Sequence, residues 1–233
     1  MEKATFYEKY TKRLLDILCA AAAIAVFWWL YLIVALLVLV KLGRPVIFQQ
    51  PRPGKGEKIF RLYKFRTMTD ARDAQGRLLP DSVRLTRFGK ALRATSLDEL
   101  PEVLNILKGD MSIIGPRPQL VRDMVFMTPE QRLRHTVMPG LTGLAQVSGR
   151  NAISWEDKLA TDLRYIRRVT FLGDVKIVLL TVKKVFCRED ISAAGMDTAE
   201  DLGDYLLRTA QVSEEAYQEL QAESKALLVT AGK

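Results

Sequence analysis

An uncharged run near the N-terminus dominates the hydropathy pattern of the chain. The run from Ile17 to Val40 holds 24 residues without a charged side chain, and about 20 apolar residues suffice for a helix to cross a bilayer. Basic residues flank it on both sides, at Lys12 and Arg13 before it and at Lys41 after it. Short basic flanks normally stay in the cytoplasm. The pattern therefore favours a helix that enters and leaves the membrane on one face, with a single spanning helix as the alternative.

Beyond this run, apolar residues recur either at every second position, as in a strand, or at the spacing of a helix. Alternating apolar and polar residues predict two short strands, Val46–Arg52 and Ile59–Thr67. Apolar positions at helical spacing predict helices at Leu85–Ala94, Asp98–Lys108, Arg122–Val137, Trp155–Val169 and Val175–Phe186. Loops or turns are expected at Arg72–Asp81, Ile113–Pro118 and Pro139–Asn151, the last with a short strand at Leu144–Val147. The last predicted helix carries lysines beside an apolar stripe, which suits a membrane surface as well as ordinary core packing.

Charge divides the chain into a basic middle and an acidic end. From Lys41 to Arg93 there are 14 Lys and Arg against 4 Asp and Glu, and from Asp197 to Lys233 there are 8 acidic residues against 3 basic ones. We expect an α+β protein: a re-entrant membrane-anchoring helix at 1–41, and a small, mostly helical cytosolic catalytic domain with a β-hairpin at 42–195. Residues 196–233 are expected to form an acidic tail with one amphipathic helix, which the chemistry does not need.

Composition narrows the function classes. The 233 residues carry a formal net charge of +8, which predicts anionic partners such as phosphates, acidic lipid headgroups or nucleic acid. Cys19 and Cys187 lie far apart and give neither a disulfide framework nor a zinc-binding motif. His135 is the only histidine, and no G-x-S-x-G turn accompanies it. A serine hydrolase is therefore disfavoured, and His135 is expected to be structural.

Two adjacent carboxylates, Asp98 and Glu99, open one of the predicted helices. A helix N-terminus attracts phosphate and keeps carboxylates ionised, and an ionised aspartate is a competent nucleophile toward phosphorus. A purely structural alternative also fits the spacing. Ser96 and Glu99 have the S-x-x-E pattern of a capping box, in which both side chains would only bond the backbone at the start of the helix.

Fixed cations near this pair favour the catalytic interpretation. Arg93 precedes the pair, Lys64 lies on the second predicted strand, and Arg117 stands between two prolines in a stiff turn. Further cations lie near the predicted hairpin, at Arg52, Lys55, Lys58 and Arg66. Carboxylates among arginines and lysines suit phosphoryl transfer assisted by one divalent metal ion. The sequence has neither a Walker A motif nor a G-x-G-x-x-G motif.

Three segments together resemble the bacterial sugar transferase family, the monotopic phosphoglycosyl transferases. They are KFRTM at 64–68, SLDELPEVLNILKGDMSIIGPRP at 96–118 and PGLTGLAQVSGRNAISW at 139–155. The resemblance covers about Lys12 to Val185. Within the family, the chain is most similar to the small enzymes that transfer bacillosamine phosphate in bacterial N-linked glycosylation.

The resemblance implies a two-step reaction. Asp98 would attack the sugar-bearing phosphate of a UDP-sugar and release UMP, and Glu99 would bind Mg2+. Undecaprenyl phosphate would then take the sugar phosphate from the aspartate, in a ping-pong sequence. Lys64, Arg93 and Arg117 match family positions that contact phosphate, and three further residues match a segment near the nucleotide or sugar: Gln146, Arg150 and Asn151.

The resemblance also implies the setting of the enzyme. Its expected partners are a UDP-sugar, undecaprenyl phosphate and membrane lipids, with a homodimer left open and no nucleic acid. The active site is expected at the cytoplasmic face of the bacterial inner membrane. The expected donor is UDP-N,N′-diacetylbacillosamine. The alternatives are another UDP-hexose (glucose, galactose or an N-acetylhexosamine) and, from another class, a basic membrane-binding module without catalysis. Family members usually have Ser-Pro where this chain has Trp28-Trp29, which puts the re-entrant topology in question.

Overall fold

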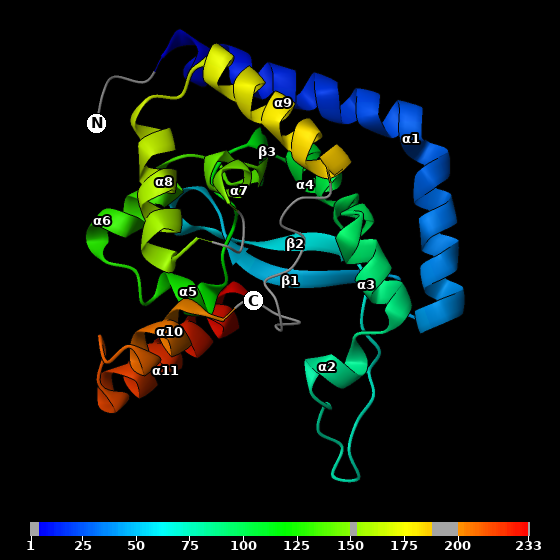
Figure 1. Cartoon of the computed structure of the whole chain (residues 1–233), viewed down its shortest axis with the longest axis vertical. Coiled ribbons are helices and arrows are strands. Elements are labelled where there is room, and N and C mark those ends of the chain that lie inside the picture. The colour runs from blue at the N-terminus through cyan, green and yellow to red at the C-terminus, as the bar shows by residue number, and fades with distance from the viewer. Residues whose placement is uncertain (1–4, 150–152, 188–199, 233) are drawn as a thin grey trace.

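The computed structural model of the chain describes residues 5–149, 153–187 and 200–232. Helix α1 (Lys12–Leu42) contains the whole uncharged run and follows a π-helical turn, η1 (Tyr7–Thr11). Among the described residues, it is the one helix long and apolar enough to cross a membrane. The predicted N-terminal apolar helix is thus confirmed. Figure 1 shows α1 running along two sides of the rest of the molecule, with a change of direction between them.

Both halves of α1 pack against the same domain. Ala20 in the first half contacts a cluster that includes Phe60 and Ile106, whereas Val34 and Val38 in the second half are buried in a different cluster. Residues 25–29 between the two halves are all exposed. The two halves of α1 thus pack on different parts of one domain.

The predicted hairpin forms the sheet at the centre of the domain. Strands β1 (Ile47–Pro53) and β2 (Ile59–Phe65) are antiparallel, joined by a turn that contains the 3-10 helix η2 (Lys55–Glu57). The free edge of β2 is covered by buried Asn105 of α4 (Glu102–Lys108), which accepts from the Tyr63 amide at 3.0 Å and donates to the Arg61 carbonyl at 2.7 Å. Because these bonds replace a third strand, they fix α4 beside β2.

The remaining elements surround the hairpin (Figure 1). Those before residue 120 are α2 (Asp81–Arg84), α3 (Arg87–Ala94), η3 (Leu97–Glu99) and β3 (Ser112–Ile114). Those that follow, up to residue 148, are α5 (Val121–Met124), α6 (Pro129–Arg132), η4 (Leu133–Thr136), β4 (Gly140–Thr142) and α7 (Leu144–Ser148). Two longer helices are α8 (Trp155–Arg167) and α9 (Phe171–Cys187). The α+β class is confirmed, as are the predicted helices at 85–94 and 155–169.

Three predicted elements are wrong in their details. The helix expected at Asp98–Lys108 is two pieces, η3 and α4. The helix expected at Arg122–Val137 is broken into α5, α6 and η4, because Thr128 and Gln131 form a capping box that begins a new helix with Pro129 at its first position. The strand expected at Leu144–Val147 is helix α7; the strand lies just before it, as β4, which pairs in parallel with β3.

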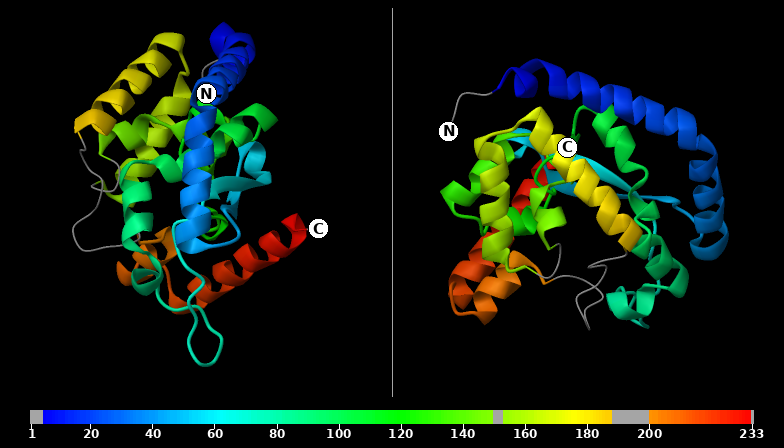
Figure 2. Two further views of the ribbon diagram at one scale, coloured as in Figure 1. Left: turned by 90° about the vertical axis from the view of Figure 1, so that its right-hand side faces the viewer. Right: turned by 45° about the horizontal axis from the view of Figure 1, so that its top comes forward.

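Helix α9 presents one apolar face outward. Its exposed apolar residues recur at helical spacing: Phe171, Leu172, Val175, Val178, Leu179 and Val182. Both views in Figure 2 show α9 on the same side of the domain as the first half of α1. An exposed apolar patch of this kind marks an interaction surface.

The C-terminal tail consists of two helices rather than the one predicted. Helices α10 (Leu202–Arg208) and α11 (Glu214–Ala231) lie on the side of the domain away from α1 and α9 (Figure 1). Leu202 of α10 is buried in a cluster with Phe126 and Trp155. The predicted boundary at residue 195 falls outside the described residues, but the tail packs as part of the domain core.

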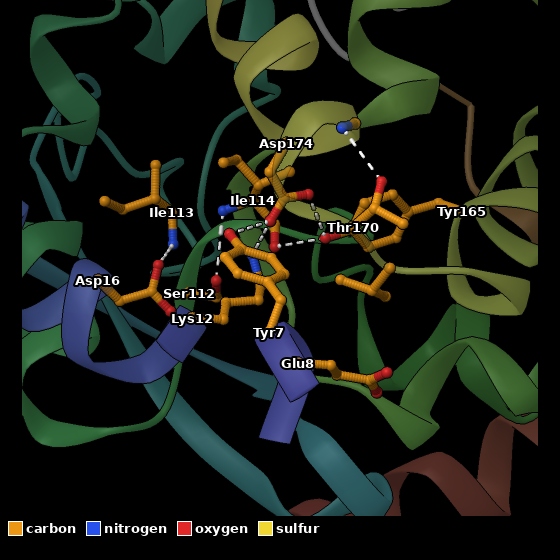
Figure 3. A network of polar contacts seen from close by, with 12 residues as sticks. Tyr7, Glu8, Lys12, Asp16, Ser112, Ile113, Ile114, Tyr165, Thr170 and Asp174 are labelled. Atoms are coloured by element: carbon orange, nitrogen blue, oxygen red, sulfur yellow. Dashed lines mark hydrogen bonds and ion pairs between the residues drawn. The ribbon is translucent and has the colours of Figure 1, made fainter. Parts of the chain in front are cut away.

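A buried polar network ties the start of α1 to α8, α9 and β3 (Figure 3). Asp174 of α9 accepts a hydrogen bond from the Tyr7 hydroxyl at 2.8 Å and pairs with Lys12. The Tyr165 hydroxyl lies 3.0 Å from Asp174 Oδ1 and 3.1 Å from the carbonyl of Ile114, at the end of β3. Helices α1, α8 and α9 are therefore held together at the strand that leads to Arg117.

Candidate active site

Asp98 lies on the short turn η3 between α3 and α4, and its side chain is buried. The turn is set by Ser96, which has a left-handed backbone conformation with φ of 55° and makes no capping hydrogen bond with its side chain. The capping-box alternative is thus wrong, because both of its side chains would have to bond the backbone. A non-glycine residue at positive φ carries backbone strain and is frequent at functional sites.

Glu99 is held by two cations from distant parts of the chain. Its Oε1 lies 2.8 Å from Nζ of Lys64 on β2 and 2.6 Å from a terminal guanidinium nitrogen of Arg117. Lys64 also lies 3.1 Å from Oε1 of Glu102, on the first turn of α4. The packing of α4 on β2 through Asn105 brings these carboxylates to Lys64.

Burial and nearby charges together shift the pKa values of the three carboxyl groups in different directions. Burial alone would raise the pKa of Glu99, but Arg117 and Lys64 outweigh it and hold that pKa well below its usual range. Burial raises the pKa of Asp98, and Lys64, Arg117 and Arg93 oppose this shift. Burial also raises the pKa of Glu102 to about 7. Glu99 is therefore the firmly ionised member of the group.

Arg93 completes the cationic surroundings of Asp98. It lies in the last turn of α3, and its Nε donates to the Thr67 hydroxyl at 3.1 Å, just after β2. Its charge acts on Asp98, as do those of Lys64 and Arg117. The structure thus brings together five predicted site residues: Asp98, Glu99, Lys64, Arg93 and Arg117.

The backbone of the Arg117 turn is fixed at three successive carbonyl groups. The Pro116 carbonyl accepts from the amide of Gly140 at 3.0 Å. Buried Arg134 donates to the Arg117 carbonyl at 2.7 Å, and Arg52 donates to the Pro118 carbonyl at 3.0 Å. These three hydrogen bonds hold the backbone of the turn in place. They therefore fix the point from which the Arg117 side chain extends.

The family model described as Bacterial sugar transferase matches residues 7–188. The chain belongs to this family. The match covers α1, the hairpin and every residue of the Asp98 cluster, and it ends before the tail helices. This sugar transferase is therefore an enzyme whose candidate centre, Asp98 and its neighbours, lies inside the family domain.

Curated relatives agree with the family assignment. The chain is 49% identical over 189 residues to an uncharacterized sugar transferase, EpsL, of Bacillus subtilis. The alignment covers 81% of this chain and 94% of that protein. It is 39% identical to the UDP-glucose:undecaprenyl-phosphate glucose-1-phosphate transferase of Caulobacter vibrioides, over 77% of this chain and 71% of that protein. An Aeromonas hydrophila UDP-N-acetylgalactosamine-undecaprenyl-phosphate N-acetylgalactosaminephosphotransferase is 40% identical, over 76% of this chain and 44% of that protein.

Of the other predicted site residues of this sugar transferase, only Gln146 lies in the described part of the chain. Gln146 lies on α7, where its Nε2 donates to the Leu141 carbonyl at 3.0 Å. In the described part of the chain, no hydrogen bond or ion pair joins Gln146 to Asp98 or Glu99. Arg150 and Asn151 lie outside the described residues. Their assignment to the nucleotide or sugar stays a prediction.

Several charged residues turn out to support the structure. Arg66, one of the cations near the hairpin, is buried and donates to the carbonyls of Met68 and Arg44. His135 is buried outside the Asp98 cluster, and burial lowers its pKa to about 4. Arg134 forms a buried ion pair with Asp162 at 2.7 Å. Sequence reasoning missed Arg134, because no local motif links it to the turn that it holds 17 residues earlier.

A magnesium ion fits this centre only with help from the substrate. No group of three or more His, Cys, Asp or Glu side chains suited to a metal ion occurs among the described residues. Glu99 is kept ionised, and both of its hydrogen bonds fall on Oε1, so that Oε2 is the oxygen that a cation would take. Mg2+ commonly takes one or two carboxylates and completes its shell with water and substrate phosphates.

Proposed function

We propose that this sugar transferase moves a sugar 1-phosphate from a UDP-sugar to undecaprenyl phosphate and releases UMP. The observation that carries the proposal is the buried Asp98 beside Glu99, with Lys64 and Arg117 paired to Glu99 and the charges of Lys64, Arg93 and Arg117 acting on Asp98. Fixed cations of this kind match the charge of a diphosphate. The names of two relatives, which specify UDP-glucose or UDP-N-acetylgalactosamine with undecaprenyl phosphate, support the same reaction.

In the first step, a carboxylate oxygen of Asp98 attacks the sugar-bearing phosphorus of the donor. The new bond joins that phosphorus to Asp98, and the bond from the same phosphorus to the bridging oxygen of the diphosphate breaks. UMP leaves with the bridging oxygen and its electron pair. Lys64, Arg93 and Arg117 neutralise charge on the transferred and leaving phosphates.

In the second step, a phosphate oxygen of undecaprenyl phosphate attacks the phosphorus of the aspartyl phosphosugar. The bond to Asp98 breaks, which restores its carboxylate and yields undecaprenyl-diphosphate-sugar. Splitting one displacement into two lets a single nucleophile serve a water-soluble donor and a lipid acceptor in turn. Bound Mg2+, held by Glu99, would supply further positive charge at the diphosphate.

We also infer how the enzyme meets its lipid acceptor. Both halves of α1 are packed on one domain. If the exposed stretch at 25–29 enters a bilayer, both ends of the helix therefore lie on the same side of it. In that stretch, the Trp29 indole donates to the Val26 carbonyl at 3.1 Å, which satisfies its polar group away from water. The apolar face of α9 adds a second lipid-facing surface. These features support a re-entrant helix, with the site at the cytoplasmic face of the inner membrane.

UMP release tests this proposal and identifies the donor. Purified protein in lipid nanodiscs is supplied with undecaprenyl phosphate, Mg2+ and one UDP-sugar at a time: diacetylbacillosamine, glucose, galactose, N-acetylglucosamine or N-acetylgalactosamine. We expect UMP release with one or a few of these donors. Glu99→Gln is expected to lower the rate at least ~100-fold and to raise the Mg2+ concentration needed for half-maximal rate.

Matched controls separate catalysis from folding. Glu130→Gln changes an acidic residue on α6, far along the chain from the centre, and is expected to keep the wild-type rate. Folded wild-type protein that releases no UMP from any donor, while binding anionic vesicles in a salt-sensitive way, would favour the non-catalytic membrane module instead.

A further inference from the structure

The tail helices α10 and α11 follow the family match, which ends at residue 188. They nevertheless lie against α5, the helix that comes directly after the Arg117 turn. This packing raises the question of what the tail adds to an enzyme whose proposed catalytic residues all lie elsewhere.

One buried carboxylate joins the tail to the segment after Arg117. Asp123 of α5 is 2% exposed, and its two oxygens serve different parts of the chain. Oδ2 accepts the backbone N–H of Leu120 at 2.9 Å, two residues after Pro118. Oδ1 accepts the backbone N–H of Leu202, the first residue of α10, at 3.0 Å. The tail thereby completes the hydrogen bonds of a group that shapes the exit from the Arg117 turn.

The tail also supplies charge to the residue that holds the turn. Arg52, whose guanidinium donates to the Pro118 carbonyl, is partly buried, and the negative charges of Asp123, Glu102 and Asp201 act on it. Asp201 comes immediately before α10 and pairs with Arg122 on α5. Removing a carboxylate that compensates a charge held away from water is destabilising. One of the three acidic groups whose charge acts on Arg52 therefore comes from the tail.

We propose that the tail is a positioning element for Arg117, acting through the Leu202 amide and the Asp201 carboxylate on Asp123 and Arg52. This inference rests on the proposed function, in which Arg117 contacts the donor diphosphate. The Arg117 side chain is 41% exposed and is therefore accessible to a ligand. The position of its backbone then determines where its guanidinium meets that ligand. Misplacement of a phosphate-binding arginine weakens binding without removing the nucleophile.

The sharpest test removes the Leu202 N–H and controls for the loss of the leucine side chain. Leu202→Pro does so at the first position of a helix, which proline tolerates, after a residue whose φ of −71° and ψ of 155° suit a following proline. Leu202→Ala is the matched variant, since it also loses the buried side chain but keeps the N–H. Tyr205→Phe, which removes only an exposed contact to Glu156, controls for general disturbance of the tail.

The measurement is the affinity for UDP with Mg2+, a diphosphate probe without the sugar, by titration calorimetry in nanodiscs. We expect Leu202→Pro to weaken UDP binding about 5-fold relative to Leu202→Ala, and Asp201→Asn to weaken it in the same direction. In an Arg117→Ala background, the Leu202→Pro effect should disappear, because the two changes act on one contact. UMP-release kinetics should show the same loss in KM, with kcat changed less than about 2-fold.

The outcomes are distinguishable from one another. Equal UDP affinity in Leu202→Pro and Leu202→Ala, with lower thermal stability in both, would make the tail a purely structural addition and overturn the inference alone. The same would follow if Leu202→Pro weakened UDP binding equally with and without Arg117. Wild-type protein that bound no UDP and released no UMP would instead contradict the proposed function, and this inference with it.

Discussion

At the scale of single residues, the three carboxyl groups of the candidate centre differ in their burial and in their ionic partners. Glu99 shares two cations and stays ionised, whereas Glu102, three residues later, is 2% exposed and has only Lys64 as a direct ionic partner in the described chain. Asp98 lies between these extremes, buried but surrounded by positive charge. Such surroundings remove water from the carboxyl group, while the nearby cations favour its ionised form.

The acidity of Glu102 gives a pH-dependent prediction. Burial raises its pKa to about 7, against about 4.3 in an unfolded chain. Between these pH values the folded protein keeps a proton that the unfolded chain has released, so this group's contribution to stability falls as the pH rises. Glu102→Gln has no titrating carboxyl group at this position, so the variant does not lose stability in this way as the pH rises. The stability of the variant relative to wild type should therefore increase from pH 5 to pH 7, by on the order of 1–3 kcal/mol.

Thermal unfolding of both proteins at pH 5, 6 and 7 checks this sign. A stability difference that stays constant over the range would show that Glu102 is already ionised in the folded protein at pH 5. Asp73→Asn, in the polar loop, serves as a control for an acidic residue away from the centre.

Much of the candidate site could be predicted at this scale. Asp98, Glu99, Lys64, Arg93 and Arg117 follow from sequence motifs, and the structure places them together. The supports could not be predicted, because Arg134 and Asp123 act on backbone groups of other segments. Arg52 was expected among the phosphate-facing cations near the hairpin, but it holds the Pro118 carbonyl.

At the scale of elements, the close approach of α3 to the end of β2 sets the position of Arg93. A Cβ atom on Gly89 would lie 1.9 Å from the Thr67 carbonyl oxygen, so only glycine fits there. Arg93 lies one helical turn further along α3 and reaches the hydroxyl of the same threonine. Thr67 thus contacts α3 through both its backbone and its side chain.

Gly89→Ala is expected to push α3 away from Thr67 and to move Arg93 with it. The clash is with backbone, which yields poorly, so we expect a loss of about 1–3 kcal/mol in stability and at least a ~10-fold lower rate of UMP release. Ala91→Ser, on the exposed side of the same helix, should stay within about 0.5 kcal/mol of wild type. Wild-type activity in Gly89→Ala would show that the position of α3 is not critical.

Element boundaries were predictable where local signals are strong. The hairpin and α3 follow from periodicity, and Gly109 ends α4 with φ of 93°. The region at 121–136 was misjudged because an apolar pattern outweighed the Thr128-Pro129 start signal. The parallel pairing of β3 with β4 joins segments about 28 residues apart, which no local pattern reveals.

At the scale of the whole molecule, α1 and the catalytic domain form one unit. The two halves of α1 pack on separate clusters of that domain, and Asp174 fixes its start to α9 (Figure 3). A straight spanning helix would have to break one of these two contact areas. The basic flanks at both ends are therefore expected on the same face of the membrane.

Cysteine labelling tests this topology. Cys19 and Cys187 are replaced by serine, and single cysteines are introduced at Lys9 or Lys41, both exposed. In spheroplasts, we expect a membrane-impermeant maleimide to label neither site, and to label both after the membrane is opened. Labelling of Lys9→Cys from outside, with Lys41→Cys protected, would establish a spanning helix and contradict the re-entrant arrangement.

Intact-mass spectrometry without the acceptor tests the central claim most directly. The enzyme is incubated with Mg2+ and the donor that supports UMP release, but without undecaprenyl phosphate. We predict a protein species heavier by one sugar phosphate group, mapped to Asp98, formed with a stoichiometric burst of UMP and discharged when undecaprenyl phosphate is added. Asp98→Asn should form no such species. UMP release that strictly requires the acceptor, with no modified protein at any time, would contradict the role of Asp98 as nucleophile.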